Sequence, residues 1–189
     1  MEEAKIVNLY DLTHTQAAPL LSQWEYPWEA LSGIGDFILE LGKTLSEEEY
    51  DRPSENVWIA KSAKVYPNTY IAGPAIIGPR TEVRPGAFIR GKALVGADCV
   101  VGNSTALKNV ILFDNVQVPH YNYVGDSILG YKSHMGAGSI TSNVKSDKTL
   151  VVVRDGKEEI ATGLKKMGAM LGDFVEVGCG SVLNPGTVI

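Results

Sequence analysis

An apolar residue at every sixth position constrains this chain more than any other feature of its sequence. A period of six fits neither an α-helix, which repeats about every 3.6 residues, nor a strand, which alternates about every two. It is typical of a solenoid in which each hexad makes a short strand and a turn, and three hexads complete a coil. We therefore predict a mainly β fold, a single-stranded left-handed parallel β-helix built from hexapeptide repeats. The repeated positions are Ile59, Val65, Ile71, Ile77, Val83, Ile89, Val95, Val101, Leu107 and Phe113.

The repeat returns near the end of the chain, so the β-helix is expected to cover residues 55–189. Leu171, Val177, Leu183 and Ile189 are again apolar and six residues apart. A solenoid cannot close its own ends. We therefore expect either that the repeat continues past Ile189 or that a partner chain covers this end.

Residues 1–54 lack the six-residue period and are predicted to form an N-terminal helical segment. The stretch Ser22–Leu41 has apolar residues at helical spacing. Pro27 suits the first turn of a helix, and Gly33 with Gly35 is expected to divide the stretch into two short helices.

The composition limits which binding partners and which cellular compartment we expect for this protein. A formal charge of -5 argues against nucleic acid, which needs concentrated basic surface. No apolar stretch is long enough to span a membrane, and the acidic N-terminus does not resemble a secretory signal, so we expect a cytoplasmic protein without membrane contact. Cys99 and Cys179 fall within the repeats without disulfide or metal spacing and are expected to be buried thiols.

Breaks in a regular scaffold are where functional residues concentrate. The six-residue period fails at Pro119 and resumes at Val124, Leu129 and Met135, and the segment Pro119–Gly138 holds His120 and His134. The period is lost again after Ser139, where residues 143–165 are predicted to form an inserted loop with a hairpin that can reach a neighbouring subunit.

Motifs in five segments of the repeat region resemble those of a known enzyme family. They are RPG at Arg84–Gly86, VGN and LKN within Val101–Asn109, HYNYVGD at His120–Asp126, GAGSITSN at Gly136–Asn143, and TGLKKMGA with GD within Thr162–Asp173. The first four resemble the acetyltransferase domain of the bifunctional glucosamine-1-phosphate acetyltransferase and N-acetylglucosamine-1-phosphate uridylyltransferase. The last is similar to archaeal-type sugar-phosphate nucleotidylyltransferases.

The resemblance implies an acyltransferase that carries acetyl from acetyl-CoA to the 2-amino group of a hexosamine 1-phosphate, in nucleotide-sugar synthesis. It also implies a homotrimer with active sites between subunits. The glycine-rich nucleotide loop of the uridylyltransferase half has no counterpart in the sequence, so uridylyltransferase activity is not expected.

Matching the motifs residue by residue assigns roles to single side chains. His120 matches the general base, and a histidine can deprotonate an amine near neutral pH. Arg84 and Lys108 match the phosphate-binding cations, and Tyr123 and Asn143 match residues that contact the sugar.

His134 stands where these bacterial enzymes typically have asparagine. The histidine can change the sugar preference, titrate, or replace a hydrogen bond. Ala137, Gly138 and Cys179 match the acetyl-CoA groove, and Lys148 can meet the CoA phosphates. No metal is expected to be required for acyl transfer.

Three alternatives stay open. The first is a non-catalytic β-helix that binds a sugar phosphate or nucleotide sugar for regulation. The second is a carbonic-anhydrase-like trimer, which needs a third histidine at the subunit interface, whereas His14 lies outside the repeat. The third is a metal site from His120 and His134, which has fewer ligands than an ordinary zinc site.

Overall fold

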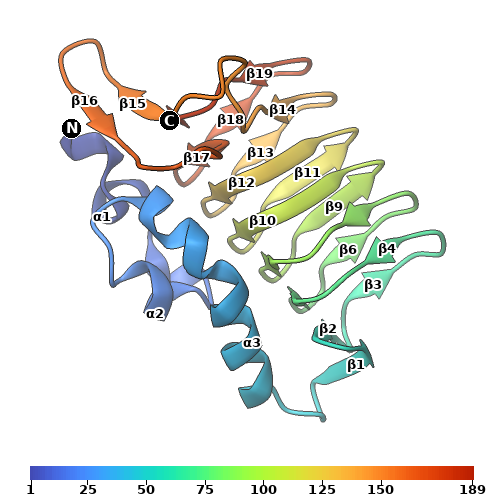
Figure 1. Cartoon of the computed structure of the whole chain (residues 1–189). Helices are drawn as coiled ribbons and strands as arrows, with labels where there is room; N and C mark the ends of the chain where they lie inside the picture. The colour runs from blue at the N-terminus through green and yellow to red at the C-terminus, as the bar shows by residue number, and fades with distance from the viewer.

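The computed structural model describes all residues, Met1–Ile189, and has the form of a three-sided prism (Figure 1). Each coil adds one short parallel strand to each side, which confirms the predicted parallel β-helix. We call one side the covered face, because helices pack against it. The other two are the polar face and the aromatic face, named after the side chains that they direct outward.

The strands of the three faces follow one another along the chain. The covered face contains β2 (Val57–Ala60), β5 (Ala75–Ile77), β8 (Ala93–Val95), the second halves of β10 (Ala106–Leu112) and β12 (Tyr123–Leu129), β17 (Ala169–Leu171) and β20 (Thr187–Val188). The polar face contains β3 (Lys64–Val65), β6 (Glu82–Val83), β9 (Val100–Asn103), β11 (Gln117–His120), β13 (His134–Met135) and β18 (Glu176–Val177). The aromatic face contains β4 (Tyr70–Ile71), β7 (Phe88–Ile89), the first halves of β10 and β12, β14 (Ile140–Thr141) and β19 (Val182–Leu183).

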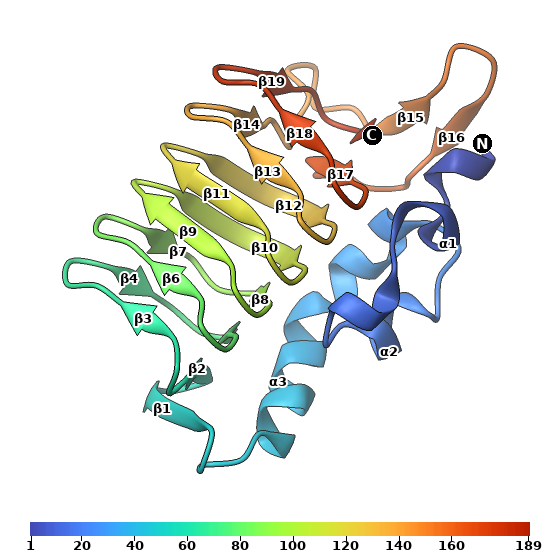
Figure 2. The same ribbon diagram turned by 180° about the vertical axis from the view of Figure 1, so that it is seen from behind.

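Helices cover the first face because its outward side chains are apolar as well as its inward ones. Helix α3 (Ile34–Thr44) contacts β5, β8 and β10, and the 3₁₀ helix η3 (Pro27–Gly33) contacts β12 (Figure 2). The predicted division is present at Gly33 but not at Gly35, which lies inside α3, and Pro27 stands in the first turn of η3 as predicted. The remaining helices are η1 (Glu2–Ala4), α1 (Ile6–Leu9), η2 (Leu12–His14) and α2 (Ala18–Leu21). The outward residues that these helices bury include Trp58, Ile76, Leu94, Ile111, Ile128 and Met170.

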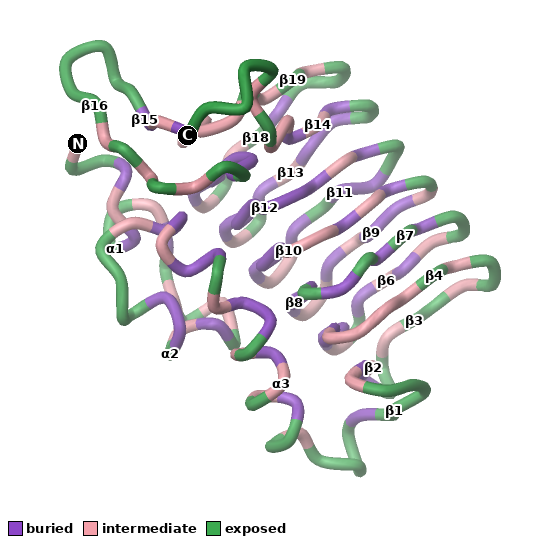
Figure 3. Tube along the Cα trace, in the orientation of Figure 1, coloured by how far each residue is buried: buried purple, intermediate pink, exposed green.

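The other two faces are free of helices (Figure 2), and the corners that border them include exposed stretches (Figure 3). On the polar face the outward column contains mostly charged and polar side chains, namely Lys64, Glu82, Val100, Gln117, His134 and Glu176. On the aromatic face the outward column is apolar although nothing covers it, and it consists of Tyr70, Phe88, Ala106, Tyr123, Ile140 and Val182.

The first break in the repeat was predicted at Pro119 with Phe113 as a repeat position, and both predictions are wrong. Leu112, not Phe113, aligns with Val95 below and Leu129 above, because the hexad after Leu107 is one residue short. Phe113 is buried against Tyr10 instead, with 5.1 Å between the ring centroids.

The short hexads turn their corners at Asn109 and Asp126. These residues have φ angles of 55° and 49°, a left-handed conformation that Asn and Asp tolerate better than most other residues. The shortening therefore begins about two hexads earlier than the sequence pattern indicates.

The inserted segment carries a hairpin of β15 (Val152–Arg154) and β16 (Glu159–Ala161). It lies beside the N-terminus of its own chain, where the Met1 amino group pairs with Glu158. Strand β1 (Tyr50–Ser54) pairs antiparallel with β2 at the opposite end of the prism. None of the helices has the length and apolar character needed to cross a membrane.

Candidate active site

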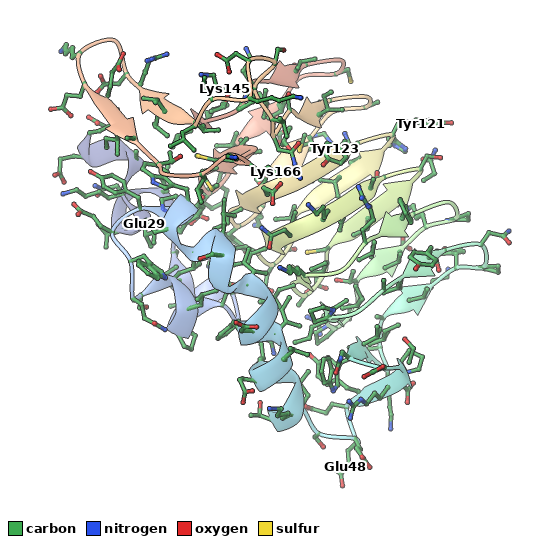
Figure 4. The ribbon with its side chains drawn as sticks, in the orientation of Figure 1. Glu29, Glu48, Tyr121, Tyr123, Lys145 and Lys166 are labelled. Atoms are coloured by element: carbon green, nitrogen blue, oxygen red, sulfur yellow. The ribbon has the colours of Figure 1, made fainter.

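His120 lies on the edge between the polar and aromatic faces, in a column with one residue from each coil. Asn103 is in register below it, and Ala137 and Cys179 follow above, because Gly138 N–H donates to the His120 carbonyl and Gly180 N–H to the Ala137 carbonyl. Figure 4 shows Tyr121, the next residue, projecting outward from this edge. His120 is therefore exposed at the rim of the prism.

The ring of His120 is oriented by Asn103. Nδ1 of the imidazole lies 3.0 Å from Asn103 Oδ1, and an amide oxygen can only accept a hydrogen bond. In the neutral imidazole, Nδ1 accordingly carries the proton and Nε2 has the free lone pair. This arrangement can take a proton from a bound substrate.

A second cluster lies at the opposite edge of the aromatic face, where the short corners are. Asn143 Nδ2 is 2.6 Å from Asp126 Oδ2 and 3.2 Å from the Tyr123 hydroxyl, and Asn109 Nδ2 is 2.9 Å from Asp126 Oδ1. Through these hydrogen bonds the Asp126 carboxylate, which is only 5% exposed, holds both amides in place. The buried Asn109 Oδ1 has no hydrogen-bond partner.

Gly125 leaves room for this cluster. A Cβ at that position would meet the Tyr123 hydroxyl at 2.5 Å and Asn143 Nδ2 at 3.0 Å. Lys108 is in register with Gly125 one coil below. The structure thus brings together Lys108, Tyr123 and Asn143, three of the residues predicted to bind the sugar phosphate.

Arg84 and His134 lie away from that cluster. Arg84 Nε is 3.0 Å from Glu82 Oε2 at the edge beside the polar face. His134 Nδ1 is 2.7 Å from Glu176 Oε2, in a polar recess of about 300 Å³ that Asn115, Gln117 and Lys132 complete. Within one chain, the predicted site is therefore split between two edges and the polar face.

The residues predicted to bind acetyl-CoA divide in the same way. Ala137, Gly138 and Cys179 belong to or adjoin the His120 column, whereas Lys148 lies in the inserted loop, where its N–H donates to the Lys145 carbonyl. The prediction that Cys179 is buried is wrong, because its place at the corner above Ala137 leaves it exposed. Cys99 is buried as predicted, and burial raises the pKa of its thiol to about 12.

Sequence reasoning missed Asn103, Asp126 and Glu176 as partners of the predicted site residues. The signal for the first two was spacing, since Asn103 precedes His120 by one short coil, and Asn109, Asp126 and Asn143 repeat at that same interval. Glu176 lies beyond the insertion, so no interval in the sequence connects it to His134. Nowhere in the structure do three or more His, Cys, Asp or Glu side chains gather in a metal-binding arrangement.

The model of the GMPPB C-terminal domain family matches residues 71–189, which include both edge clusters. The chain belongs to this family. The match begins in the first coil and runs through the inserted segment to the last residue.

Two curated relatives confirm the relationship that the motifs indicated. The Bifunctional protein GlmU of Methanococcus maripaludis is 35% identical over 166 residues, which are 87% of this chain and 40% of that protein. The bifunctional sugar-1-phosphate nucleotidylyltransferase/acetyltransferase of Sulfurisphaera tokodaii is 31% identical over 159 residues, 84% of this chain and 36% of that protein. The family member described here thus spans about two fifths of their length.

Among solved structures, similarity is found to a GDP-perosamine N-acetyl transferase mutant from Caulobacter crescentus in complex with CoA and GDP-perosamine. Its TM-score is 0.44 at 18% identity, covering 68% of this chain and 52% of that one. A hexapeptide transferase family protein from Anaplasma phagocytophilum has a TM-score of 0.44 at 18% identity, covering 70% of this chain and 72% of that one.

Proposed function

We propose that this chain is an N-acyltransferase that moves an acetyl group from acetyl-CoA to the 2-amino group of a hexosamine 1-phosphate, such as glucosamine or galactosamine 1-phosphate. The observation that carries the proposal is the exposed His120, whose Nδ1 is held by Asn103 so that Nε2 is free. The acetyltransferase named in the Sulfurisphaera tokodaii relative supports the same reaction class. The proposal covers acyl transfer and not uridylyl transfer.

In the proposed reaction, His120 Nε2 takes a proton from the amino group as its nitrogen attacks the thioester carbonyl carbon. The new C–N bond forms, the C–S bond breaks, and the imidazolium returns the proton to the departing CoA thiolate. A positioned base contributes about 10²–10⁴-fold to such a rate. The small side chains of Ala137 and Gly138 beside His120 leave the edge open for the thioester, and Lys148 is proposed to meet the CoA phosphates.

The proposal includes a homotrimer, because the site within one chain is split. The apolar column of the aromatic face lies in solvent, with Tyr70 58% and Phe88 44% exposed. Packing this face against another copy would remove that apolar surface from water and bring a neighbour's His120 edge toward Lys108 and Tyr123. Phe88→Glu should therefore dissociate the assembly in sedimentation velocity, and a wild-type monomer would refute the trimer.

The first experiment measures thiol release from acetyl-CoA with each of the two hexosamine 1-phosphates. His120→Ala should lower turnover by about 10²–10⁴-fold. Asn103→Leu should lower it less, because the base remains but loses its orientation. His14→Gln is the matched histidine control, since His14 stacks on Tyr131 at a ring distance of 3.7 Å, away from the edge.

Two outcomes would count against this function. Full activity in His120→Ala would exclude this base. If a folded wild-type assembly binds the sugar phosphate without any thiol release, the chain is instead a non-catalytic sugar-phosphate-binding protein of regulatory type.

A further inference from the structure

The polar groups at the short-corner edge line up along the prism axis. The Tyr123 hydroxyl and Asn143 Nδ2 converge over Gly125, and Lys108 is in register with Gly125 one coil below. One further coil down, the position in register with Lys108 is Arg90, whose N–H donates to the Leu107 carbonyl. Arg90 therefore continues this line of substrate-facing groups.

The charges of Arg90 and Lys108 are uncompensated. Adjacent strands lie about 4.8 Å apart, so the two side chains leave the surface as neighbours. Neither takes part in an ion pair, whereas Arg84 already pairs with Glu82 at 3.0 Å. Two adjacent cations without a carboxylate repel one another, and a bound anion relieves that repulsion.

Arg84 is poorly placed for the same anion. It precedes Arg90 by one whole hexad, which is one side of the prism, and thus lies at the other edge of the aromatic face. The aromatic ring of Phe88, in contrast, supports the Arg90 guanidinium at 5.7 Å from its centroid. The planar guanidinium can hold two phosphate oxygens at once, while the lysine adds a point charge.

We infer that Arg90, together with Lys108, binds the phosphate of the substrate, in place of the Arg84 that the sequence motif indicated. The inference rests on the proposed function for the identity of the sugar, but binding by these two cations requires only a phosphate group. It places the sugar above the phosphate along the axis, with the Tyr123 hydroxyl and Asn143 next to the ring.

Calorimetric titration of the full chain tests this without any turnover. The probes are glucosamine 1-phosphate, glucosamine without phosphate, and inorganic pyrophosphate. Arg90→Gln should weaken binding of both phosphate-bearing probes by about 10–100-fold, the usual value of a charge-assisted contact. Arg90→Lys should lose less, because the charge stays while the fork is lost. Arg80→Gln is the charge-matched control, since Arg80 pairs with Asp98 on another edge.

The inference is overturned if Arg90→Gln binds the phosphate probes like the wild type, if Arg84→Gln weakens them more than Arg90→Gln does, or if the wild type binds neither. Failure of the proposed function looks different. In that case phosphate binding depends on Arg90, but acetyl-CoA releases no thiol with either amino sugar. Thermal melting of each variant verifies that the fold is intact.

Discussion

Replacing Gly102 with alanine should destabilise the prism at the point that supports His120. The added Cβ would overlap the carbonyl oxygen and carbon of Pro119, in the next coil. The obstacle is backbone, which cannot rotate away as a flexible side chain can. The two strands must separate by about 1.5 Å or more before the atoms reach ordinary contact distance.

Separating the strands lowers the free energy of unfolding. Overpacking inside a fold costs about 1–3 kcal/mol, and a backbone obstacle belongs at the upper end. With a urea dependence of about 2 kcal/mol per molar, a loss of about 3 kcal/mol lowers the unfolding midpoint by about 1.5 M. Pro119 is bonded to His120, so the 3.0 Å contact with Asn103 should lengthen and turnover should fall as well.

Gly178→Ala is the matched control, because Gly178 occupies the same corner position two coils above Pro119. Its Cβ would meet only Ser181 Oγ, at 3.8 Å. Replacing glycine where the backbone permits it stabilises by about 0.4–1 kcal/mol, so the midpoint should stay or rise slightly. Urea unfolding of both variants at one fixed protein concentration is the assay. Equal midpoints for Gly102→Ala and the wild type would refute the reasoning.

Three further predictions follow from single contacts. A disulfide reagent at pH 8 should react with one thiol in the native protein and with two in urea. Cys179 is exposed, whereas the pKa of about 12 leaves only about 10⁻⁴ of buried Cys99 as the reactive thiolate. Two fast-reacting thiols in the native protein would contradict the burial of Cys99. The hydrogen bond from Arg80 lowers the pKa of Asp98 below 3.8, so this pair stabilises the fold above about pH 4 and loses its effect as the pH falls through the lowered pKa. The difference in unfolding free energy between wild type and Asp98→Asn should accordingly be present at pH 7 and vanish in acid, and a constant difference would be inconsistent with it. Asp126→Asn should raise the KM for the amino sugar by about tenfold with little change in kcat, since it loosens the amide partners of this carboxylate; an unchanged KM would show that the network has no bearing on binding.

The six-residue period predicted the fold because the interior of each coil admits one apolar side chain per face. It failed at Phe113 for a physical reason: Leu112 and Phe113 are both buried, one inside the coil and the other against Tyr10. A sequence pattern records that a residue is apolar, but not which apolar surroundings it has. The shortened corner at Asn109 was thereby hidden until Pro119 interrupted the pattern.

The candidate site was predictable only in part. Motif matching selected Lys108, Tyr123 and Asn143, which the fold brings together. It also selected Arg84, which lies one hexad from the edge where those residues are. A motif fixes residue types and local spacing, whereas the side of the prism depends on the number of hexads between motifs. The structure supplies this count, and Arg90 follows from it.

The covered face has a consequence for how the molecule comes apart. In a simple solenoid each coil touches only its neighbours, so coils can fray one at a time from either end. Here η3 and α3 lie across β5, β8, β10 and β12, and each of those strands belongs to a different coil. The helices therefore couple these four coils, which open together or not at all. Amide hydrogen exchange should be slowest and most uniform across the four coils, with faster local opening only in the strands that these helices do not contact.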